Sequence, residues 1–456
     1  MHRISNRSKW LSVIIVFFLV GTIVLASTYA KNARKWATLK MNNHLYVNGE
    51  FVSAGTIYDR RGRVLAITKD GKRRYSTDAT TRKSTLHAVG DTKGFIATGA
   101  HTVFKPQLIG YDPINGIYKQ KKDGADSDLT LTIDSELSNA ALKALGNNKG
   151  TVGVMNYKTG EILCMVSTPT FDPENPPYDL NLDETGKYEG VYINRFLSGV
   201  FTPGSTFKTV TAASAIENIP DINDRSFSCN GRYTLHKGSF VKCNSVHGTQ
   251  NFKKALNNSC NSAFASISVE LGNEKLTKTA EEMYFNKRIY VDGIPVTKSK
   301  FDLSNAYPID RGWAGIGQYT TLINPCHMCL IMSAIANGGT SVSPKLIKEN
   351  KYINVKQQNL KMLDSNVASE LDIMLRSNVK DKYSDKRFPN LLMAGKTGTA
   401  QVQNNKNHAL FVGYSKRQDL PLSVVVIFQN SGSYGIVQAL PVANEVLQYA
   451  LQNKIS

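Results

Sequence analysis

Residues 203–208 read Pro-Gly-Ser-Thr-Phe-Lys, and an alanine-rich run follows at 209–216. Pro-Gly interrupts regular structure, so Ser205 is expected at or near a helix N-terminus, with Lys208 three residues on along the same face. A serine hydroxyl becomes a good nucleophile when a neighbouring base takes its proton. A lysine can be that base if desolvation or nearby positive charge lowers its pKa. The helix N-terminus also offers backbone N–H groups to an anion. The stretch therefore predicts a serine nucleophile paired with a lysine base.

Two further motifs follow this stretch in order. Ser259-Cys260-Asn261 lies between two helical patterns, and Lys396-Thr397-Gly398 lies just before the last strand pair. Each motif alone is common, because S-x-x-K recurs at Ser239 and Ser377 and K-T-G recurs at Lys158. Only the ordered set combines a helix start, a turn between helices and a sheet edge. Those three places are the walls of a cleft for serine acyl transfer.

Strand patterns occur near both ends of the larger part of the chain, with helical patterns between them. The expected strands are 129–133, 151–155, 162–166, 411–414 and 422–428, and the expected helices are 134–145, an interrupted block over 205–332 and 441–453. This order predicts a mixed α/β domain whose antiparallel sheet is built from both termini. A charged, polar stretch at 119–128 predicts a domain boundary.

The N-terminus contains 21 uncharged residues, Trp10–Ala30, preceded by Arg3, Arg7 and Lys9. A helix of this length crosses a hydrocarbon core of about 30 Å, so an uncleaved single-pass anchor is expected. A cleaved signal peptide and a buried core helix are the alternatives. Positive charge flanks both ends of the span, so the charges leave its orientation open.

The formal net charge is +19, and residues 1–128 hold 21 Lys and Arg against 9 Asp and Glu. Such a balance suggests a polyanionic neighbour. Nucleic acid is set aside, because the basic residues lie beside a membrane span and no zinc-finger or RNA-binding signature accompanies them. Contact with an anionic membrane face and docking to a membrane partner are expected instead, with Arg60, Arg61 and Arg63 in the docking surface.

Six cysteines lie beyond the anchor. Cys229 and Cys243 are 14 residues apart, and they either form a disulfide or remain two free thiols. Cys260 is expected to pack away from its two neighbours, and His247 is expected to be structural. The CxxC at Cys326–Cys329 sits in an apolar helical run without a second pair, which favours core packing over zinc. No metal site is expected.

The ordered motifs resemble those of penicillin-binding proteins and serine β-lactamases. The chain looks most like a class B penicillin-binding protein, a membrane-anchored peptidoglycan transpeptidase without a glycosyltransferase domain. Supporting stretches are residues 55–66, 150–171, 194–195, 247–248, 315–318, 335–344 and 394–402. The resemblance implies the penicillin-binding transpeptidase fold, and it implies four regions: a cytoplasmic tail (1–9), an anchor (10–30), a small β-rich non-catalytic pedestal (31–128) and a transpeptidase domain (129–456).

The resemblance also implies roles for the motif residues. Ser205 would be the acylated nucleophile, Lys208 would accept its proton, and Ser259 would relay that proton to the leaving D-alanine. Substrate binding would fall to Asn261, Lys396, Thr397, Gly398 and Thr399, with the terminal carboxylate of a D-Ala-D-Ala stem peptide on the last four. Backbone N–H groups of Ser205 and Thr399 would form the oxyanion hole.

The family resemblance further implies a setting. The substrates would be peptidoglycan stem peptides outside the cytoplasm of a bacterium, and β-lactams would acylate Ser205 as substrate mimics. No cofactor is needed, and the pedestal would contact a polytopic glycan polymerase of the SEDS type. The alternatives are a β-lactam-hydrolysing or β-lactam-sensing protein and a non-catalytic scaffold for the polymerase. Family members usually have Arg-Gly where this chain has Ala54-Gly55, so that pedestal contact differs.

Overall fold

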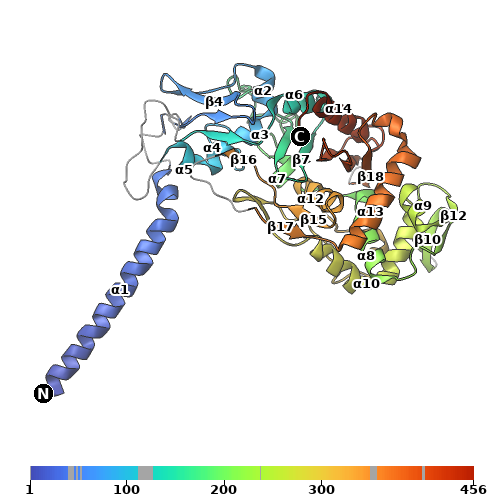
Figure 1. Cartoon of the computed structure of the whole chain (residues 1–456), viewed down its shortest axis with the longest axis horizontal. Helices are drawn as coiled ribbons and strands as arrows, with labels where there is room; N and C mark the ends of the chain where they lie inside the picture. Colours follow the sequence, from blue (N-terminus) through green and yellow to red (C-terminus); the bar gives the residue numbers. More distant parts are fainter. Residues whose placement is uncertain are drawn as a thin grey trace.

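The computed structural model describes residues 2–39, 46–47, 50–51, 54–110, 127–236, 238–349, 357–402 and 406–456. A single long helix leads into a small β-containing part, and a larger mixed α/β part follows (Figure 1). Most of the expected boundary at 119–128 lies outside the described residues.

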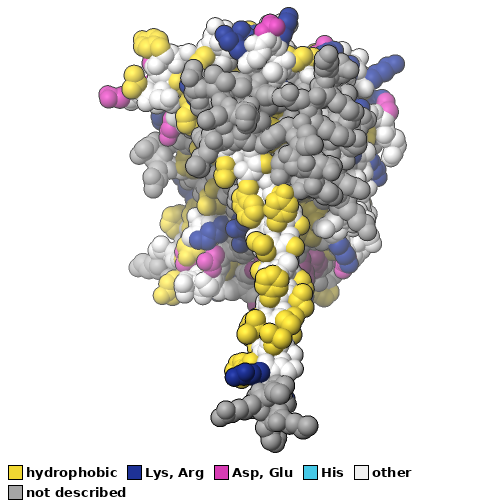
Figure 2. Space-filling model, turned by 90° about the vertical axis from the view of Figure 1, so that its left-hand side faces the viewer, with side chains coloured by type: hydrophobic (Ala, Val, Ile, Leu, Met, Phe, Trp, Pro, Cys, Tyr) yellow, Lys and Arg dark blue, Asp and Glu magenta, His cyan; other side chains and the backbone are white. Residues whose placement is uncertain are grey.

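Helix α1 (His2–Ala37) extends away from the rest of the molecule (Figure 1). Its segment Arg7–Ala33 has 27 residues, and the most apolar 18-residue window within it has a mean hydropathy of 2.5 and is not buried against the rest of the chain. Figure 2 shows hydrophobic side chains along its exposed length. By length and composition this helix can cross a membrane, as expected from Trp10–Ala30, and it continues beyond that run at both ends.

The first sheet has the strand order β16-β6-β3-β4-β5. Its strands are β16 (Ile347–Glu349), β6 (Leu129–Leu131), β3 (Ile57–Tyr58), β4 (Val64–Lys69) and β5 (Lys72–Tyr75). Strands β3 and β4 pair antiparallel. Four short helices follow β5: α2 (Ala79–Ser84), α3 (Leu86–Val89), α4 (Ala100–Val103) and α5 (Lys105–Leu108). A separate strand pair, β1 (Tyr46–Val47) with β2 (Glu50–Phe51), follows α1.

The second sheet has the order β18-β19-β20-β7-β8, and every pairing is antiparallel. Its strands are β7 (Gly150–Asn156), β8 (Ile162–Thr168), β18 (Met393–Gln401), β19 (Asn407–Ser415) and β20 (Leu422–Phe428). The sheet therefore joins the two ends of the larger part, as the strand patterns predicted. Strand β18, which carries Lys396, is at one edge.

Helices cover both faces of this sheet. Val424 and Val426 of β20 pack with α6 (Ser135–Leu145) and α14 (Ala439–Gln452). Val425 and Ile427 belong to the cluster that contains α12 (Pro325–Ala336) on the other face. Because alternate residues of a strand point to opposite faces, a strand covered on both faces is buried throughout. All seven residues of β20 are accordingly buried.

The expected helical block over 205–332 is only partly helical. Its helices are η1 (Gly204–Thr206), α8 (Lys208–Asn218), α9 (Phe252–Asn257), α10 (Asn261–Glu282), α11 (Pro308–Gly315) and α12. Between them lie β9 (Ser226–Cys229), β10 (Arg232–His236), β11 (Ser239–Lys242), β12 (Gly248–Asn251), β13 (Ile289–Val291) and β14 (Ile294–Val296). The Asp292-Gly293 turn joining β13 and β14, with both residues at positive φ, is the hairpin signal that the helical interpretation overlooked. After α12 come β15 (Thr340–Val342), β17 (Asn359–Lys361), α13 (Ser365–Ser377), η2 (Asn378–Ser384) and η3 (Asp385–Arg387).

The three arginines of the β3–β4 turn lie against the larger part of the chain. Arg60 pairs with Glu161 at 3.4 Å, Arg61 with Asp134 at 2.8 Å and Arg63 with Glu136 at 2.7 Å. Carboxylates at the start of α6 and beside β8 therefore partner these arginines within the chain, and their expected part in a docking surface stays a prediction.

Asp59 holds this turn on the first turn of α6. Its side chain is fully buried and accepts bonds from the backbone N–H groups of Arg61 (2.9 Å) and Arg63 (2.8 Å) and from the Ser135 hydroxyl (2.7 Å). We expect Asp59→Asn to lower the free energy of unfolding by about 2–4 kcal/mol, because an amide nitrogen, which cannot accept a bond, replaces one of the two carboxylate oxygens that accept from these donors. Chemical denaturation of the full chain in detergent measures this, and Asp70→Asn at an exposed turn is the control, with an expected change under about 0.5 kcal/mol. Equal stability of the Asp59 and Asp70 variants would contradict the expectation.

Candidate active site

Ser205 lies in the short 3-10 turn η1, and Lys208 begins α8 after the intervening Phe207. Lys208 Nζ donates to Ser205 Oγ at 2.8 Å, so the predicted nucleophile–base pair is in hydrogen-bonding contact. Gly204 has a φ of +54°, and a Cβ there would lie 2.7 Å from the carbonyl oxygen of Thr399. Glycine is therefore required for this turn to lie against β18.

Ser259 closes α9 in the left-handed conformation, with a φ of +52°. The N–H of Ser259 donates to the Leu256 carbonyl at 3.0 Å and the N–H of Cys260 donates to that of Ala255 at 2.9 Å, the bonding pattern of a helix C-terminal cap. Helix α10 begins at Asn261, so the turn between helices is as short as the sequence predicted. A non-glycine residue held at positive φ is strained, and such strain concentrates at functional sites.

The Lys208 amine connects the first two motifs. Besides Ser205, it donates to Ser259 Oγ at 3.2 Å, to the Ser259 carbonyl at 2.9 Å and to Asn261 Oδ1 at 2.7 Å. The third motif reaches the same point, because Lys396 Nζ donates to Ser259 Oγ at 3.1 Å. The structure thus brings together the three motifs that the sequence analysis selected.

The other matches to these motifs are engaged elsewhere. Lys158 lies in the turn between β7 and β8, and its amine donates to Asn337 Oδ1 at 2.7 Å. Ser377 ends α13 and donates to Asp381 at 2.6 Å, while Ser239 begins β11. None of these three has the helix-start context of Ser205.

Both lysines of the site are fully buried, whereas Ser205 and Ser259 are half-buried. Burial, reinforced by the neighbouring Lys396 charge, holds the pKa of Lys208 well below its usual range. Burial lowers the pKa of Lys396 to about 7, and Lys382 contributes to that shift. Two amines on one hydroxyl cannot both carry a charge without strong repulsion. The arrangement therefore favours a neutral Lys208, able to accept a proton, beside a cationic Lys396.

The free edge of β18 faces η1. The N–H of Thr397 points away from β19, since it donates to Tyr383 Oη at 3.1 Å. With its side-chain amide oriented to satisfy both bonds, Gln318 accepts from the backbone N–H of Gln401 at 3.2 Å and donates to the Gln401 carbonyl at 3.3 Å. Successive backbone N–H groups of a strand point to opposite edges. The N–H of Thr399, midway between Thr397 and Gln401, therefore points to the same free edge as theirs. A Cβ on Gly398 would meet the Pro203 carbonyl at 2.7 Å, so this glycine lets β18 and η1 approach closely.

Tyr383 and Gln318 were not among the residues selected from the sequence. Tyr383 lies on η2, and its hydroxyl also contacts Thr397 Oγ1 at 2.8 Å. Gln318 follows the tight turn at Gly317, within a stretch that the resemblance had marked without a role. No local pattern points to either residue, because their partners are 14 and 83 positions away.

All six cysteines are free thiols, so the Cys229–Cys243 disulfide is not formed. Cys326 and Cys329 are buried in α12, as core packing predicted. Cys260 is fully buried, also as expected, but its neighbours include Cys243.

A family model described as penicillin binding protein transpeptidase domain matches residues 150–448. Among curated proteins, Stage V sporulation protein D of Bacillus subtilis is 28% identical over 368 residues, covering 73% of this chain and 54% of that protein. Peptidoglycan D,D-transpeptidase PbpA of Mycolicibacterium smegmatis is 25% identical over 368 residues, covering 73% of this chain and 74% of that protein. The chain thus spans about half the length of the first relative and about three quarters of the second.

Solved structures show the same architecture. Penicillin-binding protein A of M. tuberculosis, in a ceftriaxone acyl-enzyme complex, superposes with a TM-score of 0.76 over 88% of this chain and 99% of that chain, at 21% identity. The D,D-transpeptidase domain of a peptidoglycan glycosyltransferase from Eggerthella lenta gives a TM-score of 0.74 over 89% of this chain and 99% of that chain, at 25% identity.

Proposed function

Because the chain belongs to the penicillin-binding protein transpeptidase family, of which its ordered motifs fit class B, we propose that it is a peptidoglycan D,D-transpeptidase that works through an acyl-enzyme at Ser205. One observation carries the proposal. The buried Lys208 amine contacts Ser205 Oγ, Ser259 Oγ and Asn261 Oδ1 at once, at 2.8, 3.2 and 2.7 Å. This is the geometry that acyl transfer by a serine requires.

Acylation begins with proton transfer from Ser205 Oγ to the neutral Lys208 amine. The Ser205 oxygen attacks the carbonyl carbon of the penultimate D-alanine, and the oxyanion that forms accepts bonds from the backbone N–H groups of Ser205 and Thr399. The C–N bond then breaks. The Lys208 proton passes through Ser259 Oγ to the departing D-alanine nitrogen, leaving an ester on Ser205.

The second half of the reaction reverses these proton transfers. The amine of a neighbouring stem peptide attacks the ester carbonyl, loses a proton towards Lys208 through Ser259, and expels Ser205 Oγ. The products are a peptide cross-link and free enzyme. A β-lactam would follow the first half only, because its amide nitrogen stays tethered to the acyl group.

Substrate orientation falls to β18 and Asn261. A cationic Lys396, with the hydroxyls of Thr397 and Thr399 beside it, binds the terminal carboxylate of the D-Ala-D-Ala stem. Thr397 and Thr399 are half-buried, whereas Gly398 between them is buried. The Asn261 side chain, which donates to the Lys242 carbonyl at 2.9 Å, is positioned to bind the backbone amide of the peptide.

The setting follows from the same proposal. Residues 1–9 are cytoplasmic, 10–30 form the anchor, and 31–128 form the non-catalytic pedestal of an extracytoplasmic transpeptidase domain at 129–456. A bacterial cell membrane holds the protein, and a SEDS-type glycan polymerase is its partner through the pedestal, with Arg60, Arg61 and Arg63 in the docking surface.

Acylation of the full chain in detergent tests the proposal. Intact-protein mass spectrometry with excess penicillin is expected to show one adduct, and fragmentation is expected to place it on Ser205. Incubation with a stem-peptide analogue ending in D-Ala-D-Ala should release D-alanine. Rapid loss of the adduct with turnover of a chromogenic cephalosporin would favour a β-lactamase instead. A chain that forms no adduct would favour the scaffold alternative.

We expect the second-order rate constant of penicillin acylation to have a bell-shaped pH dependence. This constant reports the free enzyme. Acid lowers it, because protonated Lys208 cannot accept the Ser205 proton. Alkali lowers it above about pH 7, because neutral Lys396 no longer attracts the carboxylate of the β-lactam. Stopped-flow acylation across both limbs measures the profile. Lys396→Arg keeps the cation at high pH, so its alkaline limb should disappear; an unchanged limb in that variant would contradict the assignment.

A further inference from the structure

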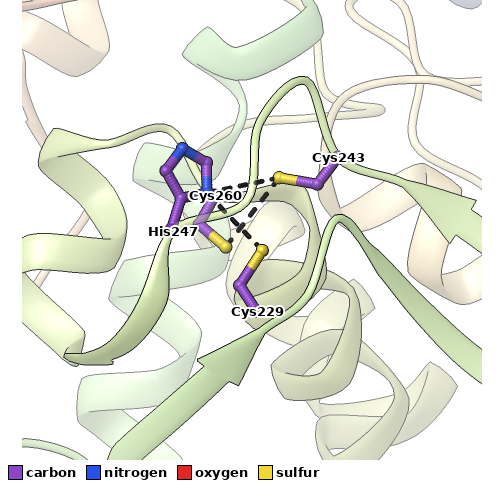
Figure 3. A group of neighbouring side chains, drawn as sticks. All are labelled: Cys229, Cys243, His247 and Cys260. Carbon is purple, nitrogen blue, oxygen red and sulfur yellow. Dashed lines mark hydrogen bonds between the residues drawn. The ribbon is translucent and has the colours of Figure 1, made fainter.

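Four sulfur and nitrogen ligand atoms meet behind the Ser259–Asn261 turn. Cys229 ends β9, Cys243 directly follows β11, His247 directly precedes β12, and Cys260 joins α9 to α10. The three Sγ atoms and a His247 ring nitrogen all lie within 4.8 Å of one another (Figure 3). The three cysteines are at most 4% exposed, and His247 is half-buried.

The spacing of these atoms matches the edges of a tetrahedral metal site. His247 Nδ1 lies 3.5 Å from both Cys229 Sγ and Cys243 Sγ, and Cys243 Sγ lies 4.0 Å from Cys260 Sγ. Zinc bonds of about 2.0–2.3 Å in tetrahedral geometry require ligand–ligand separations of about 3.5–3.8 Å. These three separations differ from the required ones by at most a few tenths of an ångström, and the remaining pairs, all within 4.8 Å, would shorten as the group closes onto an ion.

We propose that Cys229, Cys243, His247 and Cys260 form a structural Cys₃His site for Zn²⁺. Three thiolates and one imidazole make the soft donor set that zinc prefers, and four protein ligands leave no open coordination position. A disulfide would use two of the sulfurs and leave a third thiol and the imidazole nitrogen gathered beside it without a shared partner. A single ion engages all four.

The proposed zinc site is connected to the active site through the backbone. Cys260 lies between Ser259 and Asn261, and its side chain points into the ligand cluster whereas theirs contact Lys208. The N–H of Asn261 donates to Cys243 Sγ at 3.3 Å, and the N–H of Ala263 donates to Cys260 Sγ at 3.5 Å. Such N–H···S bonds orient metal ligands and are part of the outer shell of a thiolate site.

The metal would thus fix the strained Ser259 turn against the β9–β12 segment. Asn261 is held from both sides, because Cys243 accepts from its backbone and the adjoining Lys242 carbonyl accepts from its side chain. The four ligands are therefore positioning residues for Ser259 and Asn261. This positioning role rests on the proposed function, but the metal site does not.

Metal content of the full chain in detergent tests the site itself. After incubation with Zn²⁺ and gel filtration, elemental analysis is expected to find about one zinc ion per chain in the wild type and in Cys326→Ala, and none in Cys229→Ser. Cobalt-loaded wild type should show thiolate-to-metal charge transfer and the intense visible bands of a tetrahedral ion, a measurement that needs no variant. Metal-free wild type, full zinc content in Cys229→Ser, or an octahedral cobalt spectrum would each overturn the proposal.

Penicillin acylation tests the positioning role separately. Chelation of the wild type is expected to slow acylation by about 10–100-fold, with recovery when Zn²⁺ is returned. His247→Ala should be slow, and His247→Cys should recover both zinc content and rate, because four thiolates also hold zinc. If the chain binds zinc but its acylation rate is the same after chelation, the positioning role is overturned and the metal site stands. A chain that binds zinc but never acylates would refute the proposed function and leave the metal site standing.

Discussion

Replacing Ser205 by alanine is expected to abolish covalent labelling by penicillin and release of D-alanine from a stem-peptide analogue. The hydroxyl is the atom that becomes the ester, so no other group can supply it. Lys208 has no side-chain oxygen, and the Ser259 hydroxyl, 3.2 Å from Lys208 Nζ, has the proposed role of proton relay instead of ester formation. Intact-protein mass spectrometry measures the loss as the absence of any mass gain under conditions that label the wild type completely.

Two serines of the other S-x-x-K matches serve as controls. Ser239→Ala, on β11, and Ser377→Ala, at the end of α13, leave the contact between Ser205 and Lys208 in place. Both variants should be labelled at the wild-type rate within a few-fold. A mass gain in the Ser205 variant would assign the nucleophile elsewhere. Loss of labelling in the Ser239 variant, with the protein still folded, would do the same.

The second large effect is expected from Lys208→Met. Methionine fills a similar volume without a nitrogen, so the Ser205 hydroxyl loses its base and the Ser259 carbonyl and Asn261 side chain lose a donor. General base catalysis contributes about 10²–10⁴-fold, so the acylation rate constant should fall by at least that range. Stopped-flow quenching or timed mass spectrometry measures the constant, and thermal unfolding confirms that the variant is folded.

Lys158→Met is the matched control, because Lys158 begins the other K-T-G match and contacts Asn337 instead of the site. Its acylation rate should equal that of the wild type. If Lys208→Met acylates within tenfold of the wild type, the base must be another group. Lys396, whose amine also contacts Ser259 Oγ, would then be the first alternative to test.

Much of the fold could be predicted because its signals are local. Asp134 ahead of an amphipathic run predicted α6, and the side chain of Asp134 caps that helix through the N–H groups of Glu136 and Leu137. Alternating or continuous apolar runs predicted β7, β8 and β20. The six short strands between α8 and α11 were missed, since strands of three to five residues carry little periodicity.

The candidate site was predictable for a different reason. Its motifs are short and each residue type is required by the chemistry, so the order of Ser205, Ser259 and Lys396 separated them from the other matches. The contributions of Tyr383 and Gln318 could not be found this way. They act by covering the free edge of β18, and an edge exists only after strands pair.

The sequence by itself determined the helix that can cross a membrane, the strands supplied by both ends of the larger part, and the nucleophile–base pair three residues apart. Tertiary structure decided what meets at that pair. Lys208 reaches Ser259 across 51 positions, and Lys396 reaches the same hydroxyl across 137. The arginines of the β3–β4 turn gained carboxylate partners, and Cys229, Cys243, His247 and Cys260 gathered behind the Ser259 turn. The physical reason is common to all these contacts: a local pattern fixes where a side chain points along its own element, whereas packing alone brings distant elements within bonding distance.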